Sequence, residues 1–276
     1  LIYGGMATIV CAAIAILAAQ RLERMASLSI LVSAGILLSA VGFAQPNLTA
    51  AALFYLVSST LALSALFLLA ELIERSRSST EVPMEEDVEP LPSLLEPQMP
   101  PRGTNLDDDQ KVVVGQIIPW AMAFLGLSFI ACALLIIGMP PLSGFIGKLS
   151  LLNALLNPLG LGNQNSAPIS TAAWSLLVLL ILSGLASLIA FARMGIQRFW
   201  TPLERPSPIL RRIECVPIVL LLGLCVVLTF KAEPVLRFTQ AAADTLNNPE
   251  RYVMAVMGSR PVPSPEAKAA MQEVQP

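Results

Sequence analysis

The sequence predicts an all-α integral membrane protein with about six transmembrane helices, one of which is broken. Hydrophobic residues make up 55% of the 276 residues and charged residues only 13%, about half the charged share of an average soluble domain. The mean hydropathy is correspondingly high, at +0.71. The third observation is that the apolar runs approach or exceed the roughly 20 residues that span a bilayer.

Polar loops divide the chain into six apolar spans. The spans are Ile2–Ala19, Ala26–Ala44, Leu48–Ile73, Val114–Asn157, Ala172–Arg193 and Ile213–Phe230. Residues 1–75 thus hold three helices, and residues 112–231 hold three more. The segment 76–111 between them is rich in proline, serine and acidic residues, which predicts a solvated cytoplasmic loop. Residues 232–276 are expected to form an extracytoplasmic tail with a short helix near Glu250–Met257.

The positive charges of the short loops fall on one side of the predicted membrane. Arg21 and Arg24 follow the first span, Arg75 and Arg77 follow the third, and five arginines follow the fifth. The intervening loops contain neither lysine nor arginine. Because cytoplasmic loops carry the excess of positive charge, the arginine side should be cytoplasmic. The first residue, Leu1, already lies in an apolar run without the features of a signal peptide, so we expect part of the protein upstream of it.

The fourth span, residues 114–157, is too long for one straight crossing of a bilayer. It contains two adjacent prolines, Pro140 and Pro141, between Gly138 and Gly144. An α-helix cannot continue through such a sequence, and free backbone groups at membrane depth must find other partners. We therefore predict two half-helices that meet within the membrane.

Lys148 lies just after this break, inside an apolar stretch. A cation at the bilayer centre costs from about 2.5 to over 10 kcal/mol, and ordinary packing does not require that cost. No carboxylate lies three or four residues away, so its counter-charge must come from another helix, from water or from another subunit. Since free backbone groups at a helix break can coordinate ions and order water, Lys148 indicates an ion or proton path.

Four polar residues interrupt the third span: Tyr55, Ser58, Ser59 and Thr60. Hydroxyl groups in membrane helices usually bond to their own helix or to a neighbouring one, and this is the favoured interpretation. The alternative is that they line a hydrated route to Lys148. The chain has no histidine, and its four cysteines lack a short paired spacing, so the sequence predicts no metal site, disulfide framework or cofactor.

The residues around the break resemble those of a known family. The run Gly138-Met-Pro-Pro-Leu-Ser-Gly-Phe-Ile-Gly-Lys148 is similar to the motif G-x-P-P-x-x-G-F-x-G-K of the antiporter-like subunits. These subunits are shared by Mrp-type cation/proton antiporters and respiratory complex I. Gln20–Ser27 and Phe54–Leu61 resemble two further segments of the family. The six spans look like the second of its two inverted repeats plus the next helix, and the long linker is most similar to that of the D-type subunits of Mrp (Pha-type) antiporters.

This resemblance implies a multi-pass subunit of a bacterial inner membrane, embedded in lipid and assembled with other subunits of a hetero-oligomeric antiporter. It implies a secondary transporter of protons and Na⁺ or K⁺ that is not an enzyme and does not bind nucleic acid. Lys148 takes the place of the lysine that carries protons through a half-channel. Two departures weaken the expected proton relay: Glu23 stands where the family usually has lysine, and Ser58 where it often has histidine.

Two other functions stay open at this point. The same motif would suit a proton-pumping membrane subunit of an NADH:quinone oxidoreductase or of a membrane-bound hydrogenase, which would co-purify with iron–sulfur subunits. A diverged subunit that only supports assembly is the third possibility, and it would tolerate Lys148→Ala.

Overall fold

The computed structural model describes residues 1–78, 120–157, 170–200, 212–247, 253–254 and 256–258. These residues form helices and contain no β-strand, which confirms the predicted all-α fold. The elements are α1 (Ile2–Ala18), α2 (Leu22–Gly42), α3 (Pro46–Ser78), α4 (Trp120–Ile137), α5 (Ser143–Leu156), α6 (Thr171–Gly195), the π-helix η1 (Ile196–Trp200), α7 (Arg212–Phe230) and α8 (Ala232–Asn247).

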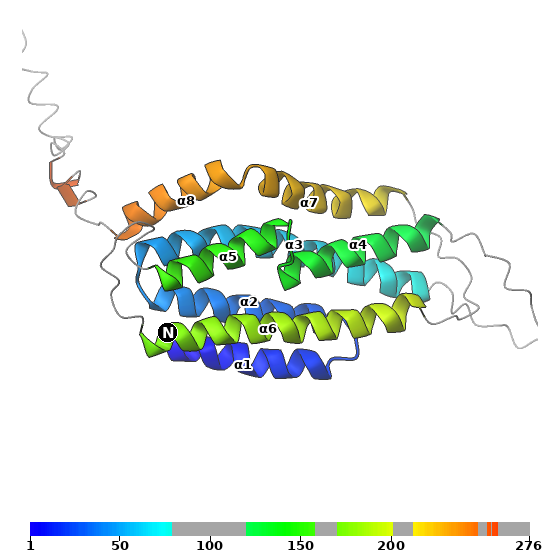
Figure 1. Cartoon of the computed structure of the whole chain (residues 1–276). Coiled ribbons are helices and arrows are strands. Elements are labelled where there is room, and N and C mark those ends of the chain that lie inside the picture. The colour runs from blue at the N-terminus through cyan, green and yellow to red at the C-terminus, as the bar shows by residue number, and fades with distance from the viewer. Residues whose placement is uncertain (79–119, 158–169, 201–211, 248–252, 255, 259–276) are drawn as a thin grey trace, which may run out of the picture.

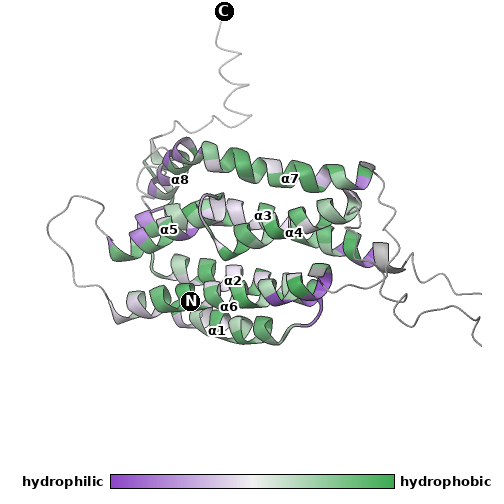
Figure 2. Cartoon of the chain, turned by 45° about the vertical axis from the view of Figure 1, so that its right-hand side comes forward, coloured by the Kyte–Doolittle hydropathy of each residue, from purple (hydrophilic) through white to green (hydrophobic). Residues whose placement is uncertain are grey.

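Five of these helices are long and apolar enough to cross a membrane, which agrees with the predicted membrane-protein class. They are α2, α3, α4, α6 and α7, whereas α1 and α5 are shorter apolar helices. The sequence instead predicts that the region of α1 spans the membrane and that α4 and α5 together form a single broken span. Figure 2 shows hydrophobic residues along most of the bundle, with hydrophilic residues gathered on α8 and toward the bundle ends.

The helices lie side by side in an elongated bundle (Figure 1). The continuous helix α3 and the shorter α4 and α5 cover a similar length, because α4 and α5 follow one another alongside it. The same holds for α7 and α8, which are separated at Lys231. Thus α4 with α5, and α7 with α8, each form a pair of consecutive helices along the bundle. Of the two junctions within these pairs, only the one between α4 and α5 contains adjacent prolines.

Helix α8 lies in the region that the sequence assigned to an extracytoplasmic tail. Its apolar and small residues recur at helical spacing, and Thr239 and Ala243 are buried against the rest of the chain. It packs mainly on α3. The spacing of Leu236, Thr239 and Ala243 is the signal that would have predicted this helix. The short helix expected near Glu250–Met257 falls partly outside the described residues.

The apolar core consists of two large clusters, one toward each end of the bundle. The cluster at the end that holds Arg21 includes Met25, Leu69 and Phe191. The cluster at the opposite end includes Ile36 and Leu176 with their neighbours. A third, small cluster of Ala62, Leu135 and Cys225 lies between helices α3, α4 and α7. The break between α4 and α5 therefore lies where one large cluster gives way to the other.

Candidate functional site

The helix break is a five-residue turn, residues 138–142, between α4 and α5. Gly138 has a φ of +80°, a backbone conformation that side chains other than glycine rarely adopt. The Pro140–Pro141 peptide bond is cis, and α5 begins after Leu142 in an extended conformation. Because neither proline has an N–H group, the turn cannot continue the hydrogen-bond ladder of α4. The last carbonyl groups of α4 thus need partners from outside that helix.

Lys148 supplies those partners. Its side chain is buried, with 9% of the residue exposed. The Nζ atom donates to the carbonyl oxygen of Ile136 at 2.9 Å and to that of Ile137 at 2.7 Å. A helix carboxyl end carries a partial negative charge and favours cations placed there. The counter-charge that the sequence left unassigned is thus, in this chain, the carbonyl end of the preceding half-helix.

No carboxylate contributes to this arrangement among the residues that the structure describes. The salt bridges found there join Arg75 with Glu71 and Glu214, and Arg237 with Glu233, and none includes Lys148. An ammonium group has three donors, and the two carbonyl bonds use two of them. One N–H of Lys148 is therefore left for water or for a group outside the described residues.

Two glycines of the motif allow the two half-helices to approach. A Cβ atom at Gly144 would overlap the carbonyl oxygen of Leu135, so the start of α5 touches the backbone of α4. A Cβ atom at Gly138 would come within 2.7 Å of the Lys148 Cδ atom. Any larger residue at these positions would push the lysine stem or the half-helices apart. The glycines of the motif are thus explained by packing as well as by backbone conformation.

A cavity of about 300 Å³ lies beside Lys148, between α5 and α6. Its other lining residues, which include Phe145 and Leu180, are apolar or glycine, so Lys148 is the charged group in its wall. Gly184 of α6 faces the ammonium group, and a Cβ atom there would lie 4.0 Å from Nζ. The absence of a side chain at Gly184 thus keeps space open next to the lysine.

Several buried polar residues lie, along their helices, at the level where the two apolar clusters meet. On α2, α3 and α6 these residues are Ser29, Ser58 and Ser183, each of which lies in sequence between members of one cluster and members of the other. On α5 they are Ser143 and Lys148. We call these five residues the polar layer. Its position predicts that water and protons, if they enter the bundle, meet polar groups at this level.

One hydrogen bond of the polar layer links two helices directly. The Ser58 hydroxyl of α3 donates to the Ser143 hydroxyl of α5 at 3.0 Å, and both residues are almost fully buried. Ser143 belongs to the break motif, so this bond fixes the first turn of α5 against α3. The sequence singled out Ser58 but not Ser143. The signal for Ser143 was its place two residues after the second proline, at the start of the second half-helix.

The other polar residues of α3 lie elsewhere. Tyr55 is buried, and its hydroxyl shares a hydrogen bond of 3.1 Å with Ser33 of α2. Ser59 and Thr60 instead bond back to the carbonyl oxygen of Leu56, on the exposed side of the helix. The structure thus brings Ser58 into the polar layer, places Tyr55 against α2 and leaves Ser59 and Thr60 apart from Lys148.

Within the described part of the chain, no group of three or more His, Cys, Asp or Glu residues is placed to hold a metal ion. All four cysteines are free thiols, of which Cys132, Cys215 and Cys225 are buried like small apolar residues, whereas Cys11 is exposed.

Comparisons with known proteins identify relatives along almost the whole chain. It is 44% identical over 259 residues to the D subunit of a probable K⁺/H⁺ antiporter of Rhizobium meliloti (strain 1021), a match that covers 94% of this chain and 46% of the relative. It is 30% identical over 136 residues to the D subunit of a Na⁺/H⁺ antiporter of Bacillus subtilis (strain 168), covering 48% of this chain and 25% of that protein.

The D subunit of a Na⁺/H⁺ antiporter of Alkalihalophilus pseudofirmus is 26% identical over 239 residues, covering 85% of this chain and 40% of that protein. No family model matches the chain. The chain spans less than half the length of each of these curated relatives. It is homologous to the D subunits of cation/proton antiporters, which confirms the resemblance predicted from the broken-helix motif.

Proposed function

We propose that the chain is part of a subunit of a multisubunit antiporter that exchanges Na⁺ or K⁺ for protons, and that Lys148 carries protons through a half-channel at the helix break. The observation that carries this proposal is the buried Lys148 ammonium group held by the two last carbonyl oxygens of α4. The names of the homologous D subunits support cation/proton exchange. Other subunits, membrane lipid and a bacterial inner membrane complete the proposed setting.

The geometry supports proton carriage because it couples the charge of Lys148 to the break. In the charged form, the ammonium group satisfies carbonyl groups that have no partner within α4. When the proton leaves, these bonds lose their charge assistance, which makes up a large part of their strength. The carbonyl groups of Ile136 and Ile137 then become better acceptors for water in the adjacent cavity. A proton that arrives or departs thereby changes the hydration of the break.

The polar layer supports a route toward Lys148 from α3. The hydroxyl groups of Ser58 and Ser143 form a hydrogen-bonded pair at the start of α5, and a hydroxyl can accept one proton while donating another. Lys148 lies on the same helix as Ser143, five residues further along. We propose that water between these groups completes the route. We assign the route to Ser58 and Ser143 rather than to Ser59 and Thr60, because the last two lie on the exposed side of α3, where they donate to the carbonyl oxygen of Leu56.

The test is cation/proton exchange in inverted membrane vesicles from antiporter-deficient cells that carry the complete complex. Lys148→Ala should abolish Na⁺- or K⁺-dependent dissipation of the pH gradient while the complex still assembles. The matched control is Lys231→Ala, at the exposed junction between α7 and α8. It should leave exchange within about twofold of the unmodified complex. Unchanged exchange with Lys148→Ala would show that Lys148 is not in the transport path and would overturn the proposed proton carriage.

A further inference from the structure

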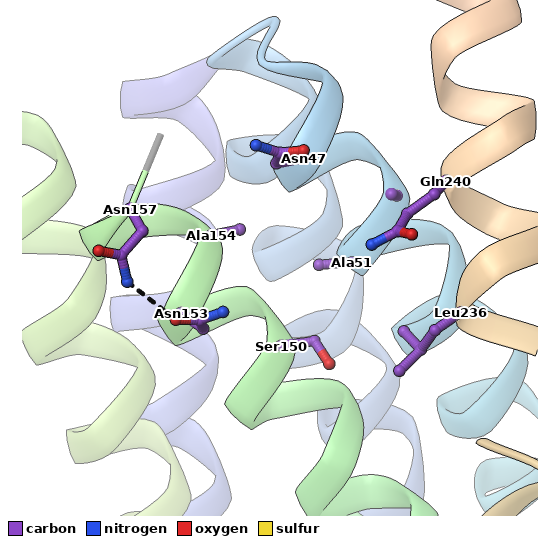
Figure 3. Close-up of a pocket in the computed structure, with 9 residues that line it drawn as sticks. Asn47, Ala51, Ser150, Asn153, Ala154, Asn157, Leu236 and Gln240 are labelled. Atoms are coloured by element: carbon purple, nitrogen blue, oxygen red, sulfur yellow. Dashed lines mark hydrogen bonds between the residues drawn. The ribbon is translucent and has the colours of Figure 1, made fainter. Parts of the chain in front are cut away.

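A second cavity lies at the end of the bundle opposite the arginine-bearing loops. It has a volume of about 240 Å³, lies between the first turn of α3, the second half of α5, and α8, and opens to the surface, where Asn153 and Gln240 are exposed. Five uncharged polar residues line it: Asn47, Ser150, Asn153, Asn157 and Gln240. Its remaining lining residues are alanine and leucine. Figure 3 shows these side chains around a shared space. We call it the amide cavity.

The lining of the amide cavity consists of neutral oxygen and nitrogen groups. Four carboxamides from three helices contribute oxygen atoms with two lone pairs each. Asn157 Nδ2 donates to Asn153 Oδ1 at 2.9 Å, which fixes these two amides relative to each other. The Ser150 hydroxyl donates to the carbonyl of Ile146 at 2.7 Å, so its own oxygen remains an acceptor. Neutral oxygens of this kind can replace the hydration shell of an alkali cation.

Two charged residues mark the inner and outer directions from this cavity. Lys148 lies on the same helix, five residues before Asn153 and nine before Asn157, or roughly 7.5 and 13.5 Å along the helix axis. Asp244 lies four residues after Gln240 and Arg237 three residues before it, so both lie on the same side of α8; both are exposed, and the charge of Arg237 is paired with that of Glu233. A cation in the cavity would therefore lie between an acidic group toward the outside and a lysine toward the interior.

The size of the cavity suits a partly hydrated ion. A water molecule occupies about 30 Å³ in the liquid, so a space of about 240 Å³ has room for an ion with several waters. A neutral lining binds such an ion weakly, as a transport site requires, because an ion that is bound too tightly is not released.

We propose that the amide cavity binds a monovalent alkali cation, K⁺ or Na⁺, through the amide oxygen of Gln240 together with water, beside Asn153, whose own oxygen accepts from Asn157. This inference rests on the proposed antiporter function, for which it supplies a cation site. Two positive charges about 10 Å apart, in surroundings with an effective dielectric constant near 20, repel enough to change an affinity roughly tenfold or more. A charged Lys148 should therefore weaken cation binding, and a neutral residue in its place should strengthen it.

Equilibrium binding of ²²Na⁺ and ⁸⁶Rb⁺, the latter standing for K⁺, to the purified complete complex tests the proposal. Gln240→Glu adds a negative charge to the cavity and should tighten binding about tenfold, whereas Gln240→Leu should weaken it at least fivefold. Lys148→Ala should tighten it about tenfold. The control is Gln20→Leu, the same loss of an amide at an exposed position at the other end of the bundle.

The tighter binding expected of Gln240→Glu cannot result from misfolding, so this variant keeps the test decisive. Equal affinities of Gln240→Glu, Gln240→Leu and Gln20→Leu would overturn the proposal and leave the amide cavity as a water-filled space. If the same complex still exchanges cations for protons in vesicles, only the cation site fails. If the unmodified complex shows no exchange, the proposed function itself fails, and the binding data still decide whether the cavity holds the ion.

Discussion

Lys148 and the arginines at the end of the bundle show two ways in which this chain accommodates positive charge. Arg21 and Arg198 line a polar cavity of about 300 Å³ that also contains Glu23 and Glu74. Both signs of charge are present there, and Arg21, Glu23 and Glu74 are exposed. Lys148 instead lies among apolar side chains in the middle of the bundle and bonds to two backbone carbonyl groups.

The difference lies in what surrounds each charge. At the bundle end, water and nearby charges of opposite sign make a cation inexpensive, and exposed ion pairs contribute about 1 kcal/mol or less. At Lys148, the cation depends on one local feature, the open carbonyl end of α4. The helix break and the lysine therefore form one structural unit: the break leaves carbonyl groups open, and the ammonium group of Lys148 bonds to them.

The largest effect is expected from Lys148→Arg. An arginine keeps the positive charge and the capacity to bond to the carbonyls of Ile136 and Ile137, but it does not release its proton in proteins. Exchange in vesicles should fall at least tenfold while assembly of the complex is kept. The comparison variant is Arg198→Leu. One guanidinium nitrogen of Arg198 is buried without a hydrogen-bond partner among the described residues. Exchange by the Arg198→Leu complex should stay within about twofold of that by the unmodified complex. Normal exchange with Lys148→Arg would exclude proton carriage by this residue.

A loss of stability is the next largest effect, and it is expected from Gly144→Ala. The added methyl group would overlap the carbonyl oxygen of Leu135, and overpacking of this kind typically costs about 1–3 kcal/mol. The melting temperature of the purified complex, followed by size-exclusion chromatography after heating, should fall by several degrees. Gly223→Ala in α7 is the control, because a Cβ atom there has no neighbour within 4 Å in the described part of the chain. Equal melting temperatures for both variants would mean that the half-helices are not in close contact.

The smallest effect is expected from Ser58→Ala, which removes one hydroxyl group of the polar layer. Loss of the bond to Ser143 should cost about 0.5–1.5 kcal/mol. Ser143→Ala should cost a similar amount, and the double variant should cost less than the sum, since both changes remove the same bond. Thr60→Ala, which loses only a bond within its own helix, should change stability by less than about 0.5 kcal/mol. Strict additivity of Ser58→Ala and Ser143→Ala would argue against the bond between α3 and α5.

The amino-acid sequence by itself determined the all-α membrane class, the approximate positions of the helices and the unusual position of Lys148. These features follow from local properties: runs of apolar residues, adjacent prolines and a charge in an apolar stretch. Local properties were less informative at helix ends. The third span was predicted to end at Ile73, whereas α3 continues to Ser78, with Glu71 and Arg75 forming an ion pair on its exposed last turns.

The tertiary structure decided which groups meet. The bond between Ser58 and Ser143 joins residues 85 positions apart, and the amide cavity brings Asn153 of α5 together with Gln240 of α8. No local pattern specifies such pairs, because they depend on which helices pack together and at what height. Even the partners of Lys148, only 11 and 12 residues away, depend on how the turn at Gly138 sets the first turn of α5 against the end of α4. The sequence thus placed the charge, and the packing of the helices determined what balances it.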